Sequence, residues 1–166
     1  MANLLPEQKL GYPSSDGKPM AETGIHVQTI LMLHAALQDF FKDRPDVFIA
    51  SDMFWYWELG NPKARTAPDV MIVPGVGNHH RRSFFSWEEN GAVPRVVFEM
   101  ASQSTWKKDL KSKRARYRKL SVPEYVIFDP EALYLPEPLM GFQLKGTRYI
   151  RMPLAADGSL GCSLGF

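Results

Sequence analysis

Residues 95–129 read RVVFEMASQSTWKKDLKSKRARYRKLSVPEYVIFD, and this stretch decides the fold. Its two ends, residues 95–100 and 124–129, are rich in valine, isoleucine and aromatic side chains, and each follows a proline, which is typical of strands. Between them, serines and a threonine in residues 102–105 are candidate N-caps of a helix that ends before Pro123. The stretch therefore predicts a helix that crosses over between two neighbouring strands of one sheet.

The same signals predict the remaining elements. Residues 21–42 gather their apolar side chains on one side of a helical projection, which indicates an amphipathic helix. Residues 46–50 and 53–59 are two strand-like runs joined by two polar residues, and we expect them to pair as a hairpin. Further strands are expected at residues 69–73, 142–144 and 148–152, the last two as a C-terminal hairpin. The order predicts an α/β domain whose mixed sheet is flanked by an N-terminal helix and a crossover helix.

Length and composition are those of one ordinary domain over residues 1–166. The chain is 45% hydrophobic, with 20 basic and 18 acidic side chains, and its mass suffices to bury about 70% of its surface without staples. The lone cysteine, Cys162, excludes an internal disulfide and fits a reducing, cytoplasmic location. Residues 1–19 are rich in proline, glycine and serine and are expected to form a loose arm. The longest uncharged stretch, residues 23–38, is too short and too polar to span a membrane.

Basic side chains are concentrated in residues 106–119, named here the basic helix. This segment holds eight basic residues and one acidic residue, a net charge of +7, so the rest of the chain sums to −5. The pattern indicates a polyanionic partner, although a solvated helix face is the more common reason for a run of charge. The candidate nucleic-acid-binding residues are Lys107, Lys108, Lys111 and Arg114.

One cation of the basic helix falls on its apolar side. The apolar positions repeat at spacings of four and three residues. They are Trp106, Leu110, Lys113, Tyr117 and Leu120. Because burying an unpaired charge costs several kcal/mol, the ammonium of Lys113 either meets a carboxylate at the sheet or reaches past its packed stem to solvent. Spacing alone leaves both interpretations open.

Four acidic or imidazole side chains also fall on faces where apolar neighbours are expected. Alternation in residues 95–100 puts Glu99 on an apolar face, where its carboxylate needs a cation or a donor unless the strand end is exposed. Asp69 follows a proline at the start of a strand, where a simple turn is the common alternative. Glu22 and His26 share one side of the first helix near its start. A favourable helix dipole and a hydrogen-bonded core position are their ordinary explanations.

These residue types are the ones that a divalent-metal phosphodiesterase site needs. Mg²⁺ prefers oxygen ligands, commonly one or two carboxylates, with water and substrate phosphate completing its shell. A bound metal polarises the phosphoryl group and activates water, while a nearby lysine offsets the charge that develops in the transition state. If Asp69, Glu99 and Lys113 converge, they therefore form a site suited to phosphodiester hydrolysis.

Four motifs follow one another in this part of the chain. They are Pro68-Asp69, VFEMASQST at residues 97–105, D-L-x-x-K-x-x-x-Y at residues 109–117, and V-P-E-Y-x-x-F-D-P at residues 122–130. In this order and spacing they resemble the Uma family, a group of restriction-endonuclease-like proteins within the PD-(D/E)XK nuclease superfamily. The similarity extends over residues 22–130.

The resemblance implies a restriction-endonuclease-like core and metal-dependent hydrolysis of phosphodiester bonds in DNA. It implies Asp69 and Glu99 as ligands of one or two Mg²⁺ or Mn²⁺ ions, and Lys113 as the catalytic cation. Glu22 is a further acidic candidate, and His26 is a candidate beside it. Since cutting both strands of a duplex commonly uses two sites, a homodimer is also expected.

The sequence departs from the superfamily pattern at one position. The pattern has a lysine two residues after the glutamate, where this chain has Ala101, so the role passes to Lys113. A catalytically inactive module of the same fold that binds nucleic acid or protein stays the alternative function. Residues 54–57 are all aromatic and suit base stacking, but packing within a strand is their more common role.

Overall fold

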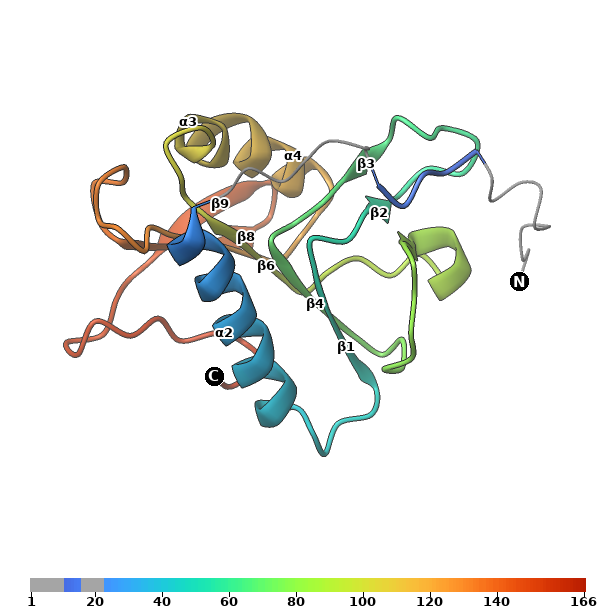
Figure 1. The fold of residues 1–166 in the computed structure, drawn as a ribbon, viewed down its shortest axis with the longest axis horizontal. Coiled ribbons are helices and arrows are strands. Elements are labelled where there is room, and N and C mark those ends of the chain that lie inside the picture. The colour runs from blue at the N-terminus through green and yellow to red at the C-terminus, as the bar shows by residue number, and fades with distance from the viewer. Residues whose placement is uncertain (1–10, 16–22) are drawn as a thin grey trace.

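The computed structural model describes residues 11–15 and 23–166 and centres on a six-stranded mixed sheet (Figure 1). Its strands are β1 (Val47–Ser51), β4 (Val70–Pro74), β6 (Val96–Met100), β7 (Glu124–Phe128), β8 (Leu139–Lys145) and β9 (Arg148–Met152). They lie side by side in the order β1-β4-β6-β7-β8-β9. Only β6 and β7 are parallel to each other within this sheet. The predicted mixed sheet is confirmed, and so is the C-terminal hairpin of β8 and β9.

The basic helix connects the two parallel strands. It consists of α3 (Trp106–Lys108), a π-helical turn η2 (Asp109–Lys113) and α4 (Arg114–Lys119). Parallel neighbours need a connection of a dozen or more residues, because the chain must return to the same end of the sheet. The crossover predicted from the sequence is therefore confirmed, whereas the π turn in its middle was not predicted.

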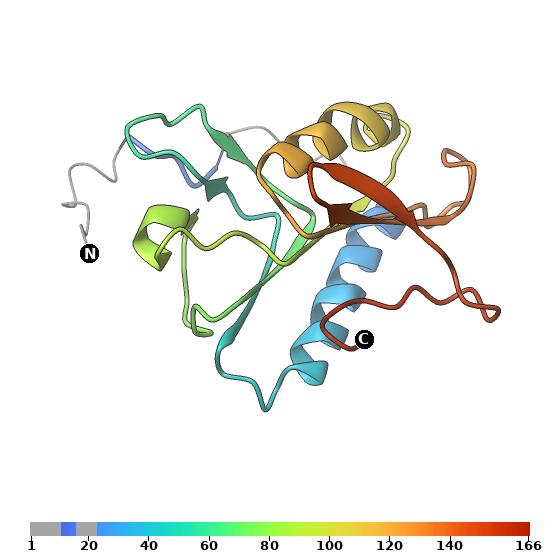
Figure 2. The same cartoon turned by 180° about the vertical axis from the view of Figure 1, so that it is seen from behind.

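The two helical segments cover opposite faces of the sheet (Figure 1 and Figure 2). On one face α2 (Gly24–Phe40) contributes Leu37 to a buried cluster that includes Ile72 of β4. On the other face Tyr117 of α4 joins a second buried cluster with Val97 of β6. Since strand side chains alternate between faces, this three-layer arrangement determines which strand residues can meet the basic helix.

Both ends of α2 have specific contacts. The hydroxyl of Thr23 accepts a hydrogen bond from the backbone N–H of His26 at 3.4 Å and caps the helix. At the other end the ring of Phe166 lies 5.8 Å from that of Phe40 and 5.9 Å from that of Phe41, centroid to centroid. The helix predicted over residues 21–42 is thus present over Gly24–Phe40, with residues 21 and 22 outside the described part.

The predicted hairpin of residues 46–50 and 53–59 is wrong. β1 pairs with β4, whereas β2 (Trp55–Tyr56) lies in a separate sheet between β3 (Arg65–Thr66) and β5 (Phe84–Phe85). Between β1 and β2, Asp52 adopts a left-handed φ of 47°, which ends β1 and redirects the chain. The strand-forming composition of both runs was recognised, but their partners lie far away in the sequence.

Two further segments contain order that the sequence did not predict. The long polar loop before β6 includes β5 and a 3₁₀ turn, η1 (Ser86–Glu89). In the described part of the N-terminal arm, residues 11–15, the ring of Tyr12 packs edge-on against Tyr56, and its hydroxyl accepts a hydrogen bond from the backbone N–H of Gly60. Across the described residues, every helix is too short or too polar to cross a lipid bilayer.

Candidate active site

The register of β4 and β6 brings Asp69 and Glu99 side by side. Val70 pairs with Phe98 in this antiparallel ladder, so the next residues, Asp69 and Glu99, project from the same face. The backbone N–H of Met100 donates a hydrogen bond to Asp69 Oδ2 at 2.6 Å. The two acids therefore meet at the end of the ladder, on the face that the basic helix covers.

Lys113 reaches this pair of acids from the basic helix. Its ammonium nitrogen Nζ lies 2.8 Å from Glu99 Oε2 and 3.0 Å from Asp109 Oδ1. The side chain is 20% exposed. Of the two interpretations that spacing left open, the structure has the buried pairing rather than an ammonium in solvent.

Tyr117 completes the surroundings of Glu99. Its hydroxyl donates to Glu99 Oε1 at 2.5 Å, so that both oxygens of this fully buried carboxylate have a donor. The Tyr117 oxygen also lies 3.4 Å from the hydroxyl of Thr66. Burial and the charge of Glu99 raise the pKa of Tyr117 well above its ordinary value, so the phenol remains a hydrogen-bond donor at neutral pH.

Asp109 is a site residue that sequence reasoning missed. Its side chain is fully buried, and Oδ1 forms the ion pair with Lys113. Within residues 11–15 and 23–166, Oδ2 has no hydrogen-bond partner. A signal was present, because Asp109, Lys113 and Tyr117 follow one another at intervals of four residues, which places them near one face of a helix.

The π turn that carries both Asp109 and Lys113 is held by a second buried tyrosine. The hydroxyl of Tyr125 on β7 donates to the backbone carbonyl of Asp109 at 3.0 Å. Single π turns within α-helices are rare and occur frequently at functional sites. Here the hydrogen bond from Tyr125 attaches the π turn of the crossover helix to β7, next to the acid cluster.

The cluster contains more acid than base. When all groups are ionised, the three carboxylates of Asp69, Glu99 and Asp109 and the single ammonium of Lys113 sum to −2. Burial raises the pKa of Asp69 to about 6 although Lys113 opposes the shift. Burial and the neighbouring Asp69 raise the pKa of Glu99 to about 8. Burial lowers the pKa of Lys113, but the surrounding carboxylates outweigh it and raise the pKa overall, so the ammonium stays charged.

The additional site candidates have different outcomes. His26 Nε2 lies 3.9 Å from Asp69 Oδ2, and the residue is only 4% exposed, so the structure brings this imidazole to the edge of the cluster. Glu22 lies outside the residues that the structure describes. Ala101, at the position of the superfamily lysine, is buried and carries no polar group.

The candidate nucleic-acid-binding residues lie on the outer side of the basic helix. Lys107, Lys108 and Lys111 are exposed, whereas Arg114 is half-buried with its guanidinium carbon 4.8 Å from the ring centroid of Phe142. The cations of this helix thus divide into Lys113, which is turned to the acids, and an outward set that faces solvent or aromatic rings.

Comparisons with known proteins bear on the family and on the fold. The sequence matches the Uma2 family, described as "Putative restriction endonuclease", over residues 3–158. The crystal structure of a putative nuclease belonging to DUF820 from Anabaena variabilis ATCC 29413 is similar, with a TM-score of 0.57 and 12% sequence identity, over 87% of this chain and 82% of that chain. Among curated proteins no sequence matches. At this identity the structural likeness shows a shared fold alone.

Proposed function

Since the chain belongs to the Uma2 family, we propose that it is a metal-dependent endonuclease that hydrolyses phosphodiester bonds in DNA. The observation that carries the proposal is the convergence of Asp69, Glu99 and Lys113 from two strands and the crossover helix. Two carboxylates beside a charged lysine are the groups that metal-assisted phosphodiester hydrolysis uses.

The donor set fits a magnesium or manganese site. No group of three or more His, Cys, Asp or Glu side chains among the described residues is arranged to hold a metal ion. Asp69 and Glu99 would therefore supply two carboxylates, and water and substrate oxygens would complete the shell of Mg²⁺. The charge of −2 that the cluster has when all its groups are ionised is also what one divalent cation would balance. The raised pKa values of Asp69 and Glu99 mark these carboxyls as groups that a cation would stabilise in the ionised form.

In this proposal Asp69 and Glu99 hold one or two metal ions, which when bound would supply an activated water and polarise the phosphoryl group. Lys113 acts as a cation rather than a base, because its pKa is raised and its proton stays on Nζ. From that position the ammonium would offset charge that develops on the phosphate. Glu99 and Asp109 fix its place, and Tyr117 fixes the orientation of Glu99.

The outward cations serve substrate binding in the same proposal. Lys107, Lys108, Lys111 and Arg114 would contact the phosphate backbone, which is the interaction that dominates affinity for nucleic acids. His26 beside Asp69 would restrain that carboxylate at the rim of the site. A homodimer would give one site for each strand of a duplex.

The decisive experiment is incubation of supercoiled plasmid with the protein and Mg²⁺ or Mn²⁺. We expect nicking or linearisation by the wild type and none by Asp69→Ala or Glu99→Ala, each purified in parallel. Asp46→Ala is the matched control, because Asp46 is an exposed acid paired with Arg44 outside the site. Equal cleavage by all four preparations would indicate a contaminant and remove the proposal.

A non-catalytic nucleic-acid-binding module is the second candidate. It is favoured by Ala101 at the superfamily lysine position and by the ion pairing of Lys113, which already engages Glu99 and Asp109. In that case the protein would bind DNA in a salt-sensitive manner. The wild type would then show no detectable cleavage with either metal, so variants of Asp69 or Glu99 could not change a cleavage rate.

A further inference from the structure

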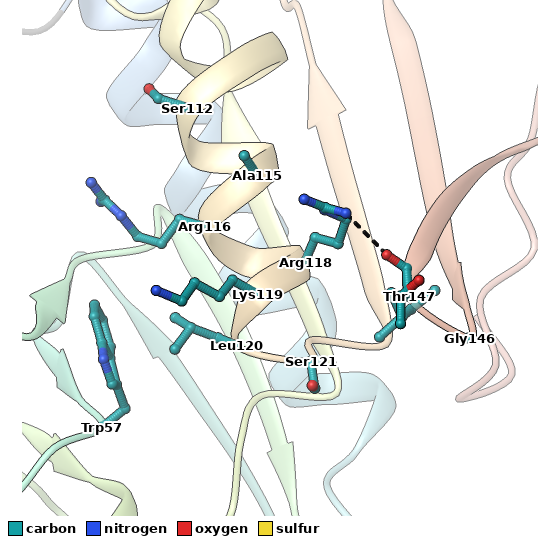
Figure 3. Close-up of a pocket in the computed structure, with 11 residues that line it drawn as sticks. Trp57, Ser112, Ala115, Arg116, Arg118, Lys119, Leu120, Ser121, Gly146 and Thr147 are labelled. Atoms are coloured by element: carbon teal, nitrogen blue, oxygen red, sulfur yellow. Dashed lines mark hydrogen bonds between the residues drawn. The ribbon is translucent and has the colours of Figure 1, made fainter.

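A second basic surface lies at the C-terminal end of α4 (Figure 3). It is a groove of about 710 Å³ between this helix, the chain after β2 and the turn that joins β8 to β9. Its lining includes Trp57, Arg116, Arg118, Lys119, Gly146 and Thr147. It contains none of the residues of the acid cluster.

The groove has a one-sided charge. Its lining has three cations, and of the described residues that line it none is acidic. Figure 3 shows Arg116 and Lys119 extending on the side of the helix that faces Trp57, while Arg118 extends the other way. Arg118 donates to the backbone carbonyl of Thr147 at 3.1 Å, which fixes its guanidinium at the opposite wall. Such a set of cations favours an anionic ligand that passes around the end of the helix.

A smaller groove of about 380 Å³ adjoins the first and shares Arg118 with it. It adds Lys111, Arg114 and Arg148, together with the ring of Tyr149. The two grooves together collect six cations, five from the basic helix and Arg148 from β9. A ligand with charges repeated along its length matches this arrangement better than a single small anion does.

The groove is connected to the acid cluster through Arg116. Its guanidinium lies 3.4 Å from the Thr66 hydroxyl, which lies 3.4 Å from the Tyr117 oxygen. Tyr117 in turn donates to Glu99. A polymer held in the groove would therefore lie one layer of side chains away from the candidate site of hydrolysis.

Trp57 gives the groove an aromatic wall. Trp55 and Tyr56 before it are fully buried in the small sheet, whereas Trp57 is only partly buried. It contacts Trp55 with ring planes at 69° and packs in part against the hydrophobic cluster that contains Trp55. Aromatic side chains beside cations are the combination that binds single-stranded nucleic acids, because unpaired bases stack on the ring while the cations track the backbone.

We propose that this groove binds a single-stranded segment of nucleic acid next to the site of hydrolysis. Arg116, Arg118 and Lys119 contact its phosphates, and Trp57 stacks on one base. The inference rests on the proposed nuclease function for its biological purpose, but the binding itself is independent of catalysis. A duplex keeps its bases stacked within the helix, so the contact with Trp57 selects unpaired strands.

Fluorescence anisotropy in EDTA tests the groove without cleavage. The probes are a labelled oligothymidylate and a labelled duplex of equal length. We expect the double variant Arg116→Ala/Lys119→Ala to weaken oligothymidylate binding about tenfold or more and to reduce the slope of log K against log salt by about 1.4, two phosphate contacts' worth. Trp57→Leu should weaken the single strand about tenfold while changing duplex binding little.

Two matched variants serve as controls. Arg82→Ala removes an exposed arginine that does not line either groove, and it should bind oligothymidylate as the wild type does. Trp57→Phe keeps an aromatic face, so it should lose less affinity for oligothymidylate than Trp57→Leu does. Unchanged affinity in the double variant, or equal loss in Arg82→Ala, overturns the proposal. Equal loss of duplex and single strand in Trp57→Leu overturns the assignment to unpaired strands. If Trp57→Leu melts early, the double variant decides, because Arg116 and Lys119 are exposed and their removal leaves the core intact.

The plasmid assay separates this inference from the proposed function. Groove-dependent binding with no metal-dependent cleavage would retain the groove and remove the nuclease. Cleavage that depends on Asp69 and Glu99, with normal oligothymidylate binding by the double variant, would retain the nuclease and remove the groove.

Discussion

The ammonium of Lys113 lies 2.8 Å from the carboxylate of Glu99, although the two residues are 14 positions apart in the sequence. The superfamily pattern takes its lysine from the same strand as the glutamate, but here that position is the buried Ala101. The crossover helix instead delivers the cation from above the sheet. Glu99 is thus paired with a cation from the crossover helix, whereas its own strand supplies none at that position.

Replacing Lys113 by methionine should reduce metal-dependent cleavage about 100-fold or more, because the cation beside the reacting phosphate is lost. Metal-free stability should also fall at pH 8, where Asp69, Glu99 and Asp109 would face no ammonium, and the loss should be smaller at low pH, where Asp69 and Glu99 are protonated. Plasmid cleavage and thermal melts at both pH values measure these effects. Lys42→Met is the control, because Lys42 is 65% exposed and lies at the far end of α2. Cleavage within tenfold of wild type would contradict the assignment.

Tyr117→Phe should lower metal affinity about 10- to 100-fold, because a hydrogen-bonded partner of a candidate ligand is removed. The loss of a donor to a buried carboxylate should also cost about 1–3 kcal/mol of stability. Calorimetric titration with Mn²⁺ and thermal melts measure both. Tyr149→Phe makes the same chemical change at a hydroxyl that bonds the carbonyl of Val122, and it should leave Mn²⁺ affinity unaltered. If Tyr117→Phe and Tyr149→Phe both bind Mn²⁺ as tightly as the wild type does, Tyr117 has no part in the site.

Asp109→Asn should separate stability from activity. Removing one of the three carboxylates clustered around Lys113 relieves repulsion, so the metal-free protein should melt at the same temperature as wild type or higher at pH 8. Cleavage should fall about 10- to 100-fold, because Lys113 loses one of its two anchors. Asp39→Asn, at a side chain that is 80% exposed, should change neither quantity. Full cleavage activity in Asp109→Asn would mean that Glu99 alone positions the ammonium.

Stability without metal should decrease as pH rises. The pKa of Asp69 is about 6 and that of Glu99 about 8 in the folded protein, against ordinary values near 4 in the unfolded chain. The folded state therefore binds more protons between about pH 4 and pH 8, and its stability is lost progressively through this window. Added Mg²⁺ competes with these protons, so the rise in melting temperature should be larger at pH 8 than at pH 5.

Thermal melts in EDTA and in Mg²⁺ across this range provide the measurement. The double variant Asp69→Asn/Glu99→Gln should flatten both dependences, whereas Asp46→Asn should not, because the hydrogen bond from Arg44 lowers the pKa of Asp46 and keeps its titration below this range. A stability that rises steadily from pH 4 to pH 8 in EDTA would show that protons are not retained in the cluster.

Local sequence signals were sufficient where partners are near or follow from periodicity. The crossover over residues 95–129 consists of one helix between two parallel strands. The turn residues and the hydrophobic pattern specify the helix as well as the strands. The predicted hairpin failed because the composition of β1 and β2 suits strands equally well in either sheet. The pairing of β1 with β4 is instead decided by packing across the whole domain, and no short-range pattern reports it.

The site shows the same division. The apolar stripe of the basic helix located Lys113, and the alternation of β6 located Glu99. Asp109 stands in the D-L-x-x-K-x-x-x-Y motif but was not predicted as a site residue, because a single aspartate among eight cations resembles an ordinary surface charge. Its burial follows from the π turn held by Tyr125. Tyr117 was recognised only as an apolar position, since its hydroxyl becomes important only when Glu99 lies beneath it.

The ladder between β4 and β6 has an implication for the newly made protein. Asp69 stands opposite Glu99 only while Val70 pairs with Phe98, and a slip by one residue would turn Asp69 to the other face of the sheet. A chain that is misregistered or still incomplete thus lacks one of its two candidate metal ligands. Under the proposed nuclease function, only molecules in which these two strands have reached their final register would have both carboxylates in place.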